Sequence, residues 1–264
     1  MKTLSYCCVL LLSLAVFQSC NSNAQSPVDT PSTANVLSVE ALQKADSLAK
    51  LQAYEDSLLA LKTAEEAALL AAQQIKDSLA KMADSAWVDL EWAAPDMIFD
   101  IRYATTNNFV EEVMYDCPKC FIRAATAKAL IKAQENLKKQ YGYNLKMFDC
   151  YRPLDVQKKL WKKLPDRRYV ADPAKGSMHN RGLALDLTLV DKDGNEFDMG
   201  THFDYFGKEA YPSYTGHSAQ INKNRQILRT ALEAQGFGVS TTEWWHFSYR
   251  KQSFPVSNYQ WSCE

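Results

Sequence analysis

The clearest alternation of hydrophobic and polar positions along the chain is in residues 183–190, which read LALDLTLV. Leucine occupies every second position, and smaller residues and one carboxylate, Asp186, stand between the leucines. A period of two predicts a β-strand whose leucine face lies in the core. Asp186 is then on the opposite face, where its small neighbours leave open space beside the carboxylate.

Other segments show a helical period. Apolar residues spaced three and four apart predict helices over 124–141 and 221–235, each followed by a glycine that ends it. A further helix is expected just after Arg152-Pro153, and short strands are expected at 88–90, 97–103 and 145–150. Helices and separated strands follow one another without regular βα alternation. The pattern therefore predicts an α+β fold with a small central antiparallel sheet flanked by helices.

Residues 36–86 have a different composition, rich in Ala, Leu, Lys, Glu, Asp and Gln and without Gly or Pro. Such a run predicts a long N-terminal helical spacer ahead of a domain at 87–264. Its leucines do not keep a strict heptad, so self-association through 36–86 and a partly helical, solvated linker both remain open. Residues 20–35, rich in Ser, Asn, Thr and Pro, are expected to form a flexible tether.

The N-terminus has the pattern of an export signal. Met1-Lys2 precedes an apolar run over 7–17, which is too short to span a bilayer comfortably, and Gln18-Ser19-Cys20 follows. A cysteine directly after a small residue resembles the processing site of bacterial lipoproteins. We therefore expect a signal peptide over 1–19 and a periplasmic or cell-envelope lipoprotein, anchored to a membrane through lipidated Cys20. The alternative is an ordinary secretory signal in which Cys20 is incidental.

Charge and cysteine content narrow the function classes. The 264 residues carry a formal net charge of -1, and without a basic excess we expect no nucleic-acid partner. Cys117, Cys120, Cys150 and Cys263 would form up to two disulfides in an oxidising compartment, with three possible full pairings. A metal site at Cys117-x-x-Cys120 is disfavoured, because no second cysteine pair has the spacing of a zinc site.

Two short segments contain the candidate chemistry. His179, Asp186 and His246 supply two imidazoles and one carboxylate, and three protein ligands with an open fourth position are typical of catalytic zinc. The same ligands also suit iron. Glu243 would take a proton from metal-bound water. Because His179 and Asp186 are seven residues apart, His179 belongs in the preceding loop, where Gly182 permits a bend. The odd spacing of Glu243 and His246 likewise requires a turn or bulge.

These segments carry a resemblance to a known family. Ser-x-His-x6-Asp at 177–186 and Glu-Trp-Trp-His at 243–246 resemble the zinc D-alanyl-D-alanine dipeptidases of the vancomycin-resistance type, a group related to metallo D,D-carboxypeptidases and the hedgehog signalling domain. Three further motifs occur in the same order, within 100–109, 149–153 and 199–204. The resemblance, over about 88–250, implies a D,D-peptidase (hedgehog-like) fold, one zinc ion, and hydrolysis of D-Ala-D-Ala or a similar D,D-dipeptide in cell-wall peptide turnover.

The resemblance also implies a role for each matching residue. His179, Asp186 and His246 would bind zinc, Glu243 would be the general base and acid, Arg152 would stabilise the oxyanion with Asp149 orienting it, Tyr103 and Asp204 would hold the substrate ammonium, and Ser177 would contact the substrate. Two other functions remain open. A peptidoglycan D,D-carboxypeptidase or endopeptidase would need room for a longer chain beside Asp204. A non-catalytic cell-wall-binding lipoprotein would have no use for a base at Glu243.

Overall fold

The computed structural model describes residues 33–263. The predicted signal peptide 1–19, the lipidation site Cys20 and the tether up to residue 32 lie outside the described residues. The chain divides into two compact units, Met1–Ala64 and Glu65–Glu264. Each is described by itself.

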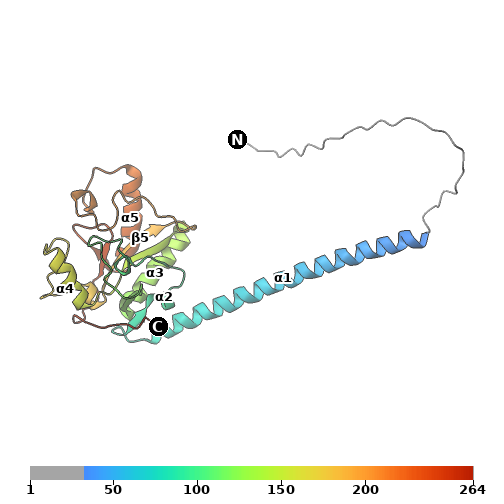
Figure 1. Ribbon diagram of the computed structural model, residues 1–264, viewed down its shortest axis with the longest axis horizontal. Helices are drawn as coiled ribbons and strands as arrows, with labels where there is room; N and C mark the ends of the chain where they lie inside the picture. Colours follow the sequence, from blue (N-terminus) through green and yellow to red (C-terminus); the bar gives the residue numbers. More distant parts are fainter. Residues whose placement is uncertain (1–32, 264) are drawn as a thin grey trace. The chain divides into compact units, whose positions relative to one another are not determined.

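The first unit contains most of the long helix α1, Thr33–Lys81 (Figure 1). The leucines over 42–61 are exposed, Leu42 by 70% and Leu59 by 65%, so they form no core among the described residues. Alanine-rich sequence and pairs one turn apart, such as Lys50 with Asp46 at 2.7 Å, suit a solvated helix. In the described part of the chain, no helix is long and apolar enough to cross a membrane.

The last turns of α1 belong to the second unit. Leu79 is buried in its core, and Met82 packs against that core just beyond the helix. Lys128 donates a hydrogen bond to the Met82 carbonyl at 2.8 Å. The packed core of this unit therefore includes residues that precede Trp87.

A five-stranded sheet forms the centre of the second unit. Its strand order is β2 (Ile98–Phe99), β4 (Asn144–Asp149), β5 (Ala184–Val190), β7 (His246–Tyr249), β6 (Phe237–Val239). The neighbours are antiparallel except for β2 and β4, which run parallel. The sheet is therefore mixed at one edge, because a long crossover through α3 separates β2 from β4. A second, two-stranded sheet pairs β1 (Trp87–Asp89) with β3 (Phe121–Arg123).

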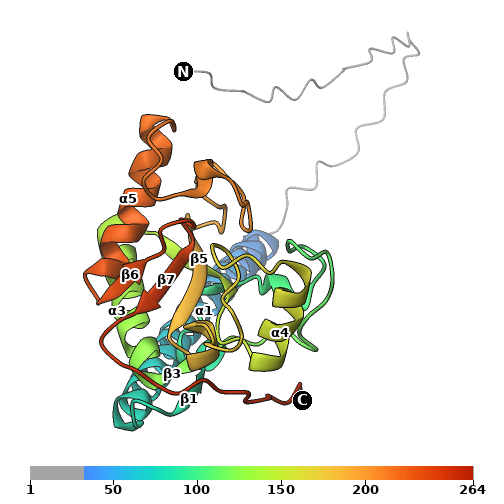
Figure 2. The ribbon, with the colours of Figure 1, turned by 90° about the vertical axis from the view of Figure 1, so that its left-hand side faces the viewer.

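Helices cover this sheet and confirm the expected α+β fold. The remaining helices are α2 (Leu90–Ala93), α3 (Ala124–Tyr141), α4 (Leu154–Lys163) and α5 (Ala219–Glu233), with 3-10 turns η1 (Arg102–Ala104), η2 (His179–Arg181) and η3 (Lys208–Ala210). α3 and α5 contact each other and lie on one side of β5 and β7, whereas α4 lies on the other side (Figure 2). Gly142 ends α3 in the left-handed conformation, with φ of 72°, as its position predicts.

Two local expectations need correction. β5 is buried on both faces, because the leucine face joins the core while His179 and His246 cover the face of Asp186. The strand expected over 97–103 ends at Phe99. Tyr103 instead lies in η1, where the Asn108 side chain donates a hydrogen bond to the Arg102 carbonyl at 3.2 Å and favours a turn.

Candidate active site

His179 lies in η2, immediately before β5. Gly182 ends this turn with φ of 70°, and a Cβ there would come within 2.6 Å of the Trp87 ring. Nδ1 of His179 is 2.7 Å from the carbonyl oxygen of Cys150. A carbonyl only accepts hydrogen bonds, so Nδ1 carries the proton and Nε2 of the neutral ring presents a lone pair.

Asp186 and His246 lie opposite each other on β5 and β7 (Figure 2). Nδ1 of His246 is 2.9 Å from Oδ1 of Asp186 and 3.1 Å from Nε2 of His179, and the ligand atoms of all three residues lie within 4.8 Å of one another. Burial by itself would raise the pKa of Asp186. The two imidazoles outweigh burial and lower this pKa well below its usual value.

The donor set of this cluster fits a divalent metal ion. The lone pair on Nε2 of His179 points at a second imidazole nitrogen and a buried carboxylate. Such electron-rich atoms repel one another unless a proton or a metal ion lies between them. Nε2 of His246 has its own partner, the Ser248 hydroxyl at 3.1 Å, which leaves Nδ1 for the ion. Two nitrogens and one carboxylate oxygen suit zinc or iron.

Glu243 lies in the bend between β6 and β7 and lines the same cleft as the three ligands. The Ser240 hydroxyl is 3.5 Å from its carboxylate. Burial raises the pKa of Glu243 to about 8; His246 opposes this shift, and Asp186 adds to it. A carboxyl group with such a pKa exchanges a proton near neutral pH, as a general base and acid must.

Arg152 is nearly buried and is held by the residues around it. Its Nε and Nη2 donate to one carboxylate oxygen of Asp149 at 3.0 and 2.6 Å, and Nη1 donates to Gln157 at 3.1 Å. Its guanidinium lies 4.9 Å from the ring centre of Tyr103, and Nη2 is 3.8 Å from Asp186. The cation is therefore fixed beside the ligand cluster, with its pKa raised by Asp149 against the effect of burial.

Apart from Asp149, the residues that support Arg152 were not found from the sequence. The Tyr115 hydroxyl donates to Asp149 at 2.7 Å, Gln157 donates to the carbonyl of Ala171 at 2.7 Å, and Asn180 donates to the carbonyl of Arg152 at 2.7 Å. Gln157 is one helical turn beyond the arginine motif, and Asn180 is inside the histidine motif, so spacing could have suggested both. Tyr115 is 34 residues from Asp149, and no local pattern indicates it.

Tyr103 and Asp204 contact each other and line the same cleft. The Tyr103 hydroxyl donates to Asp204 at 3.4 Å, and the backbone N–H of Phe109 donates to the same carboxylate at 3.2 Å. Asp204 has φ of 61°, a left-handed conformation that is unfavourable for a non-glycine residue and often marks a functional position. Burial raises the pKa of Asp204 to about 8, and the charge of Asp186 adds to the shift.

Ser177 also lines the cleft. Its hydroxyl accepts the backbone N–H of Asn180 at 3.2 Å, and its own N–H donates to the Asn180 side chain at 2.7 Å. The cleft has a volume of about 420 Å³ and brings the ligand cluster, Glu243, Arg152, Tyr103, Asp204 and Ser177 together. Arg167, Arg168 and Tyr169, which sequence patterns did not single out, also line it.

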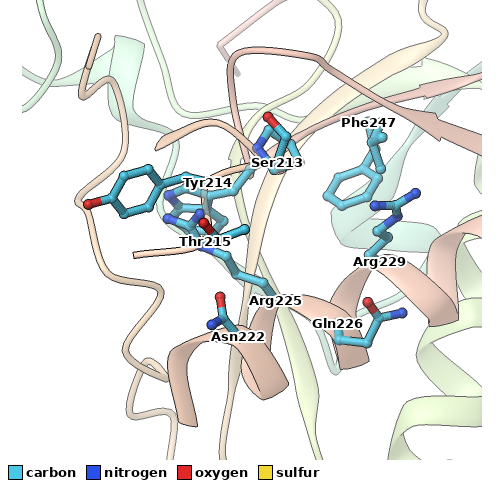
Figure 3. A pocket seen from close by; sticks show the side chains of 11 residues that line it. Ser213, Tyr214, Thr215, Asn222, Arg225, Gln226, Arg229 and Phe247 are labelled. Atoms are coloured by element: carbon cyan, nitrogen blue, oxygen red, sulfur yellow. The ribbon is translucent and has the colours of Figure 1, made fainter. Parts of the chain in front are cut away.

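A second pocket, of about 250 Å³, contains none of the predicted site residues (Figure 3). Asn222, Arg225, Gln226 and Arg229 enter it from α5, and Phe247 enters it from β7. The Arg225 guanidinium donates to three backbone carbonyls, those of Met199, Tyr211 and Glu209. Arg225 therefore ties surrounding loops to α5. The candidate metal ligands and Glu243 line the other cleft.

Comparison with known proteins agrees with this geometry. A family model described as D-ala-D-ala dipeptidase, Peptidase_M15, matches residues 83–263. The chain belongs to this family. It is therefore a peptidase, and thus a hydrolase, of a metal-dependent family, with His179, Asp186 and His246 as the candidate metal ligands.

Individual relatives match this chain over most of their own length. The D-alanyl-D-alanine dipeptidase of Escherichia coli (strain K12) is 34% identical over 177 residues, which cover 67% of this chain and 91% of the relative. The enzyme of the same name from Enterococcus faecium is 30% identical over 180 residues, covering 60% and 89%. Among solved structures, the vancomycin-resistance D,D-dipeptidase VanXYg matches 51% of this chain and 52% of its own, with 24% identity and a TM-score of 0.32.

Proposed function

We propose that this chain is a zinc metallopeptidase that hydrolyses D-Ala-D-Ala, or a similar free D,D-dipeptide, in cell-wall peptide turnover. The observation that carries the proposal is one cleft holding the His179, Asp186 and His246 cluster together with Glu243 and a separate carboxylate, Asp204. The relatives named D-alanyl-D-alanine dipeptidase support the substrate class.

The part of the cleft around Tyr103 and Asp204 suits the free amine of a dipeptide. Asp204 supplies a carboxylate, and the pKa of Tyr103 is held well above its usual value by burial and then by Asp204, so its phenol keeps its proton. An incoming ammonium pairs with Asp204 and favours its charged form, against the burial and the Asp186 charge that raise its pKa. A substrate whose amine is acylated has no such charge to offer, and this distinguishes a dipeptidase from a carboxypeptidase.

Hydrolysis then needs a base, an acid and a stabilised oxyanion. Glu243 takes a proton from the attacking water as the water oxygen bonds to the amide carbon. Arg152, fixed by Asp149 and Gln157, donates hydrogen bonds to the oxygen on which negative charge develops. Glu243 returns the proton to the leaving nitrogen as the C–N bond breaks, so the products are two amino acids.

A zinc ion held by His179, Asp186 and His246 would polarise the scissile carbonyl and lower the pKa of water. His179 is oriented for this by its bond to the Cys150 carbonyl, and His246 by Ser248. Zinc is preferred over iron here because hydrolysis needs no change of oxidation state.

We further propose that the enzyme is exported and anchored to a membrane through Cys20, with the 36–86 segment as a spacer whose exposed leucines offer a surface for self-association. Two disulfides, Cys117–Cys263 and Cys120–Cys150, support an oxidising compartment. Labelling with a radioactive fatty acid, compared between the full chain and Cys20→Ala, tests the anchor. Label on the variant would contradict it.

The substrate class is tested by measuring D-alanine release from D-Ala-D-Ala and from N-acetyl-D-Ala-D-Ala with zinc-loaded enzyme. We expect cleavage of the free dipeptide alone, and loss of that cleavage in Glu243→Ala. Equal or faster cleavage of the acetylated form would show a carboxypeptidase instead. Cleavage of neither, with zinc bound, would support a non-catalytic cell-wall-binding protein.

A further inference from the structure

Two disulfides meet beside the active site. Cys120 bonds to Cys150 and Cys117 bonds to Cys263, so the segment 117–120 is tied both to the end of β4 and to the C-terminal tail. The Cα atoms are 5.2 Å apart in the first bond and 5.8 Å apart in the second. Both cysteines of the first bond are buried: the exposed fraction is 0% for Cys120 and 1% for Cys150.

Cys150 contacts both parts of the catalytic machinery through its backbone. Its N–H donates to Oδ1 of Asp149 at 2.9 Å, and the other oxygen of Asp149 holds Arg152. Its carbonyl accepts Nδ1–H of His179 at 2.7 Å and so directs Nε2 toward the ligand cluster. A shift of this one residue would therefore move both the catalytic cation and a metal ligand.

Few regular hydrogen bonds hold this peptide in place. β4 ends at Asp149, and its register with β5 is irregular between Met147 and Asp149. Beyond the strand, Tyr151 N–H donates to the Phe121 carbonyl at 2.8 Å. Phe121 directly follows Cys120, so the disulfide and this hydrogen bond fasten the turn to the same point of β3.

The second disulfide is further from the chemistry. It secures the C-terminal tail, which has no helix or strand over 251–263. Trp261 of this tail packs edge-on against Tyr115, with ring centres 5.3 Å apart, and stacks on Phe121 with ring centres 5.9 Å apart. The tail covers the active-site support without contacting Arg152 or His179 through any hydrogen bond of the described residues.

We propose that the Cys120–Cys150 disulfide is a positioning element of the active site, which sets both Arg152 and His179, so that full activity requires the oxidised chain. This inference rests on the proposed function for its activity readout. Forming the bond removes two electrons and two protons from the Cys120 and Cys150 thiols, and a disulfide oxidant accepts them as it becomes two thiols. The enzyme is then weakly active in a reducing compartment and gains activity after oxidation.

The test compares Cys120→Ala/Cys150→Ala with the matched variant Cys117→Ala/Cys263→Ala, which also lacks one disulfide. For each, kcat and KM on D-Ala-D-Ala, zinc affinity by chelator competition, and the thermal midpoint are measured. We expect the first variant to lose roughly 10–100-fold in kcat and in zinc affinity, the range found when partners of metal ligands are removed, with KM within twofold. The second variant should lose thermal stability but keep kcat and zinc affinity within twofold of the parent.

Wild-type kcat and zinc affinity in the first variant would overturn the proposal. An equal fall of kcat and zinc affinity in both variants would also overturn the proposal, because a general loss of stability would then explain the fall. If the first variant does not fold, the Cys117→Ala/Cys263→Ala chain refolded with and without a dithiol, with its thiols counted by mass, isolates the effect of the Cys120–Cys150 bond. If the oxidised, zinc-loaded parent does not cleave D-Ala-D-Ala, the proposed function fails, while zinc affinity still decides whether the disulfide positions His179.

Discussion

The two halves of the active site are built differently. The ligand half, His179, Asp186 and His246, is set mainly by the pairing of β5 with β7 and by a turn that ends at Gly182. The arginine half consists of Arg152, Asp149, Tyr103 and Asp204. Side-chain hydrogen bonds between the end of β4 and nearby loops and turns hold it in place. Sheet pairing fixes ligand positions through many backbone bonds, whereas the loop half depends on a few individual contacts.

This difference predicts how each half responds to substitution. Replacing a side chain in the ligand half removes a function but leaves the sheet that positions its neighbours. Replacing a residue that supports Arg152 removes no reacting group, but it allows Arg152 to move. Effects on chemistry should therefore be largest at Glu243, which works beside the ligand half, and smaller at the supports of Arg152.

Glu243→Gln should give the largest loss. The amide cannot take a proton from water, so we expect kcat to fall on the order of 10²–10⁴-fold. Zinc affinity should change little, because Glu243 is not one of the clustered ligands. Steady-state kinetics with metal analysis of the same samples checks both. A variant that keeps more than a tenth of wild-type kcat would show that another group is the base.

Arg152→Lys should follow. Lysine keeps the charge but loses the two bonds to Asp149 and the bond to Gln157 that fix the guanidinium. We expect kcat to fall roughly 10²–10³-fold with a small change in KM, as for the loss of an oxyanion donor. If KM rises while kcat is unchanged, Arg152 instead binds the ground-state substrate.

Asp204→Asn should raise KM for the free dipeptide by roughly 10–100-fold, since one charge-assisted hydrogen bond is lost. Zinc affinity should not change, because Asp204 is not one of the clustered ligands, and this serves as the control. A fall in kcat with KM unchanged would place Asp204 in the chemical step instead.

The same variant makes a prediction about stability. Because the pKa of Asp204 is about 8 in the folded chain and roughly 3.9 when unfolded, the folded state binds more protons between these values. The free energy of unfolding therefore falls as pH rises from 4 to 8. Metal-free Asp204→Asn should match wild type at pH 4 and be more stable at pH 8 and above in thermal melts. A constant difference across this range would contradict the assignment of the shift to Asp204.

Gln157→Met should give the smallest effect, about tenfold in kcat, because Arg152 keeps its bonds to Asp149 and loses only the acceptor of its Nη1–H. The matched control is Gln134→Met, another buried glutamine, which bonds Asn144 and the Leu145 N–H. Both variants should lower the thermal midpoint, but only Gln157→Met should lower kcat. Equal kcat values in the two variants would show that Gln157 has no positioning role.

The same contrast explains what could be predicted from sequence. Helix α3 matches its predicted bounds, 124–141, because a sustained period and a terminal glycine are local signals. Asp186 also lies in a strand, as the alternation of 183–190 predicts, and the structure pairs that strand with the one that begins at His246. The roles assigned to these residues remain predictions for the experiments above.

The sequence contains no local pattern that predicts contacts between distant loops. The parallel pairing of β2 with β4 depends on a crossover rather than on the residues of either strand. The disulfide pairing, one of three that the cysteine count allows, depends on where 117–120 meets the end of β4. Tyr115 supports Asp149 only because that loop folds back over it.

The most direct test of the account is a zinc titration of chelator-treated enzyme, followed by D-alanine release from D-Ala-D-Ala at each step. Activity should rise linearly to one zinc per chain and then level off, and Asp186→Asn should neither bind that zinc tightly nor recover activity. Full activity without metal, or recovery in Asp186→Asn equal to wild type, would contradict a hydrolase centred on His179, Asp186 and His246.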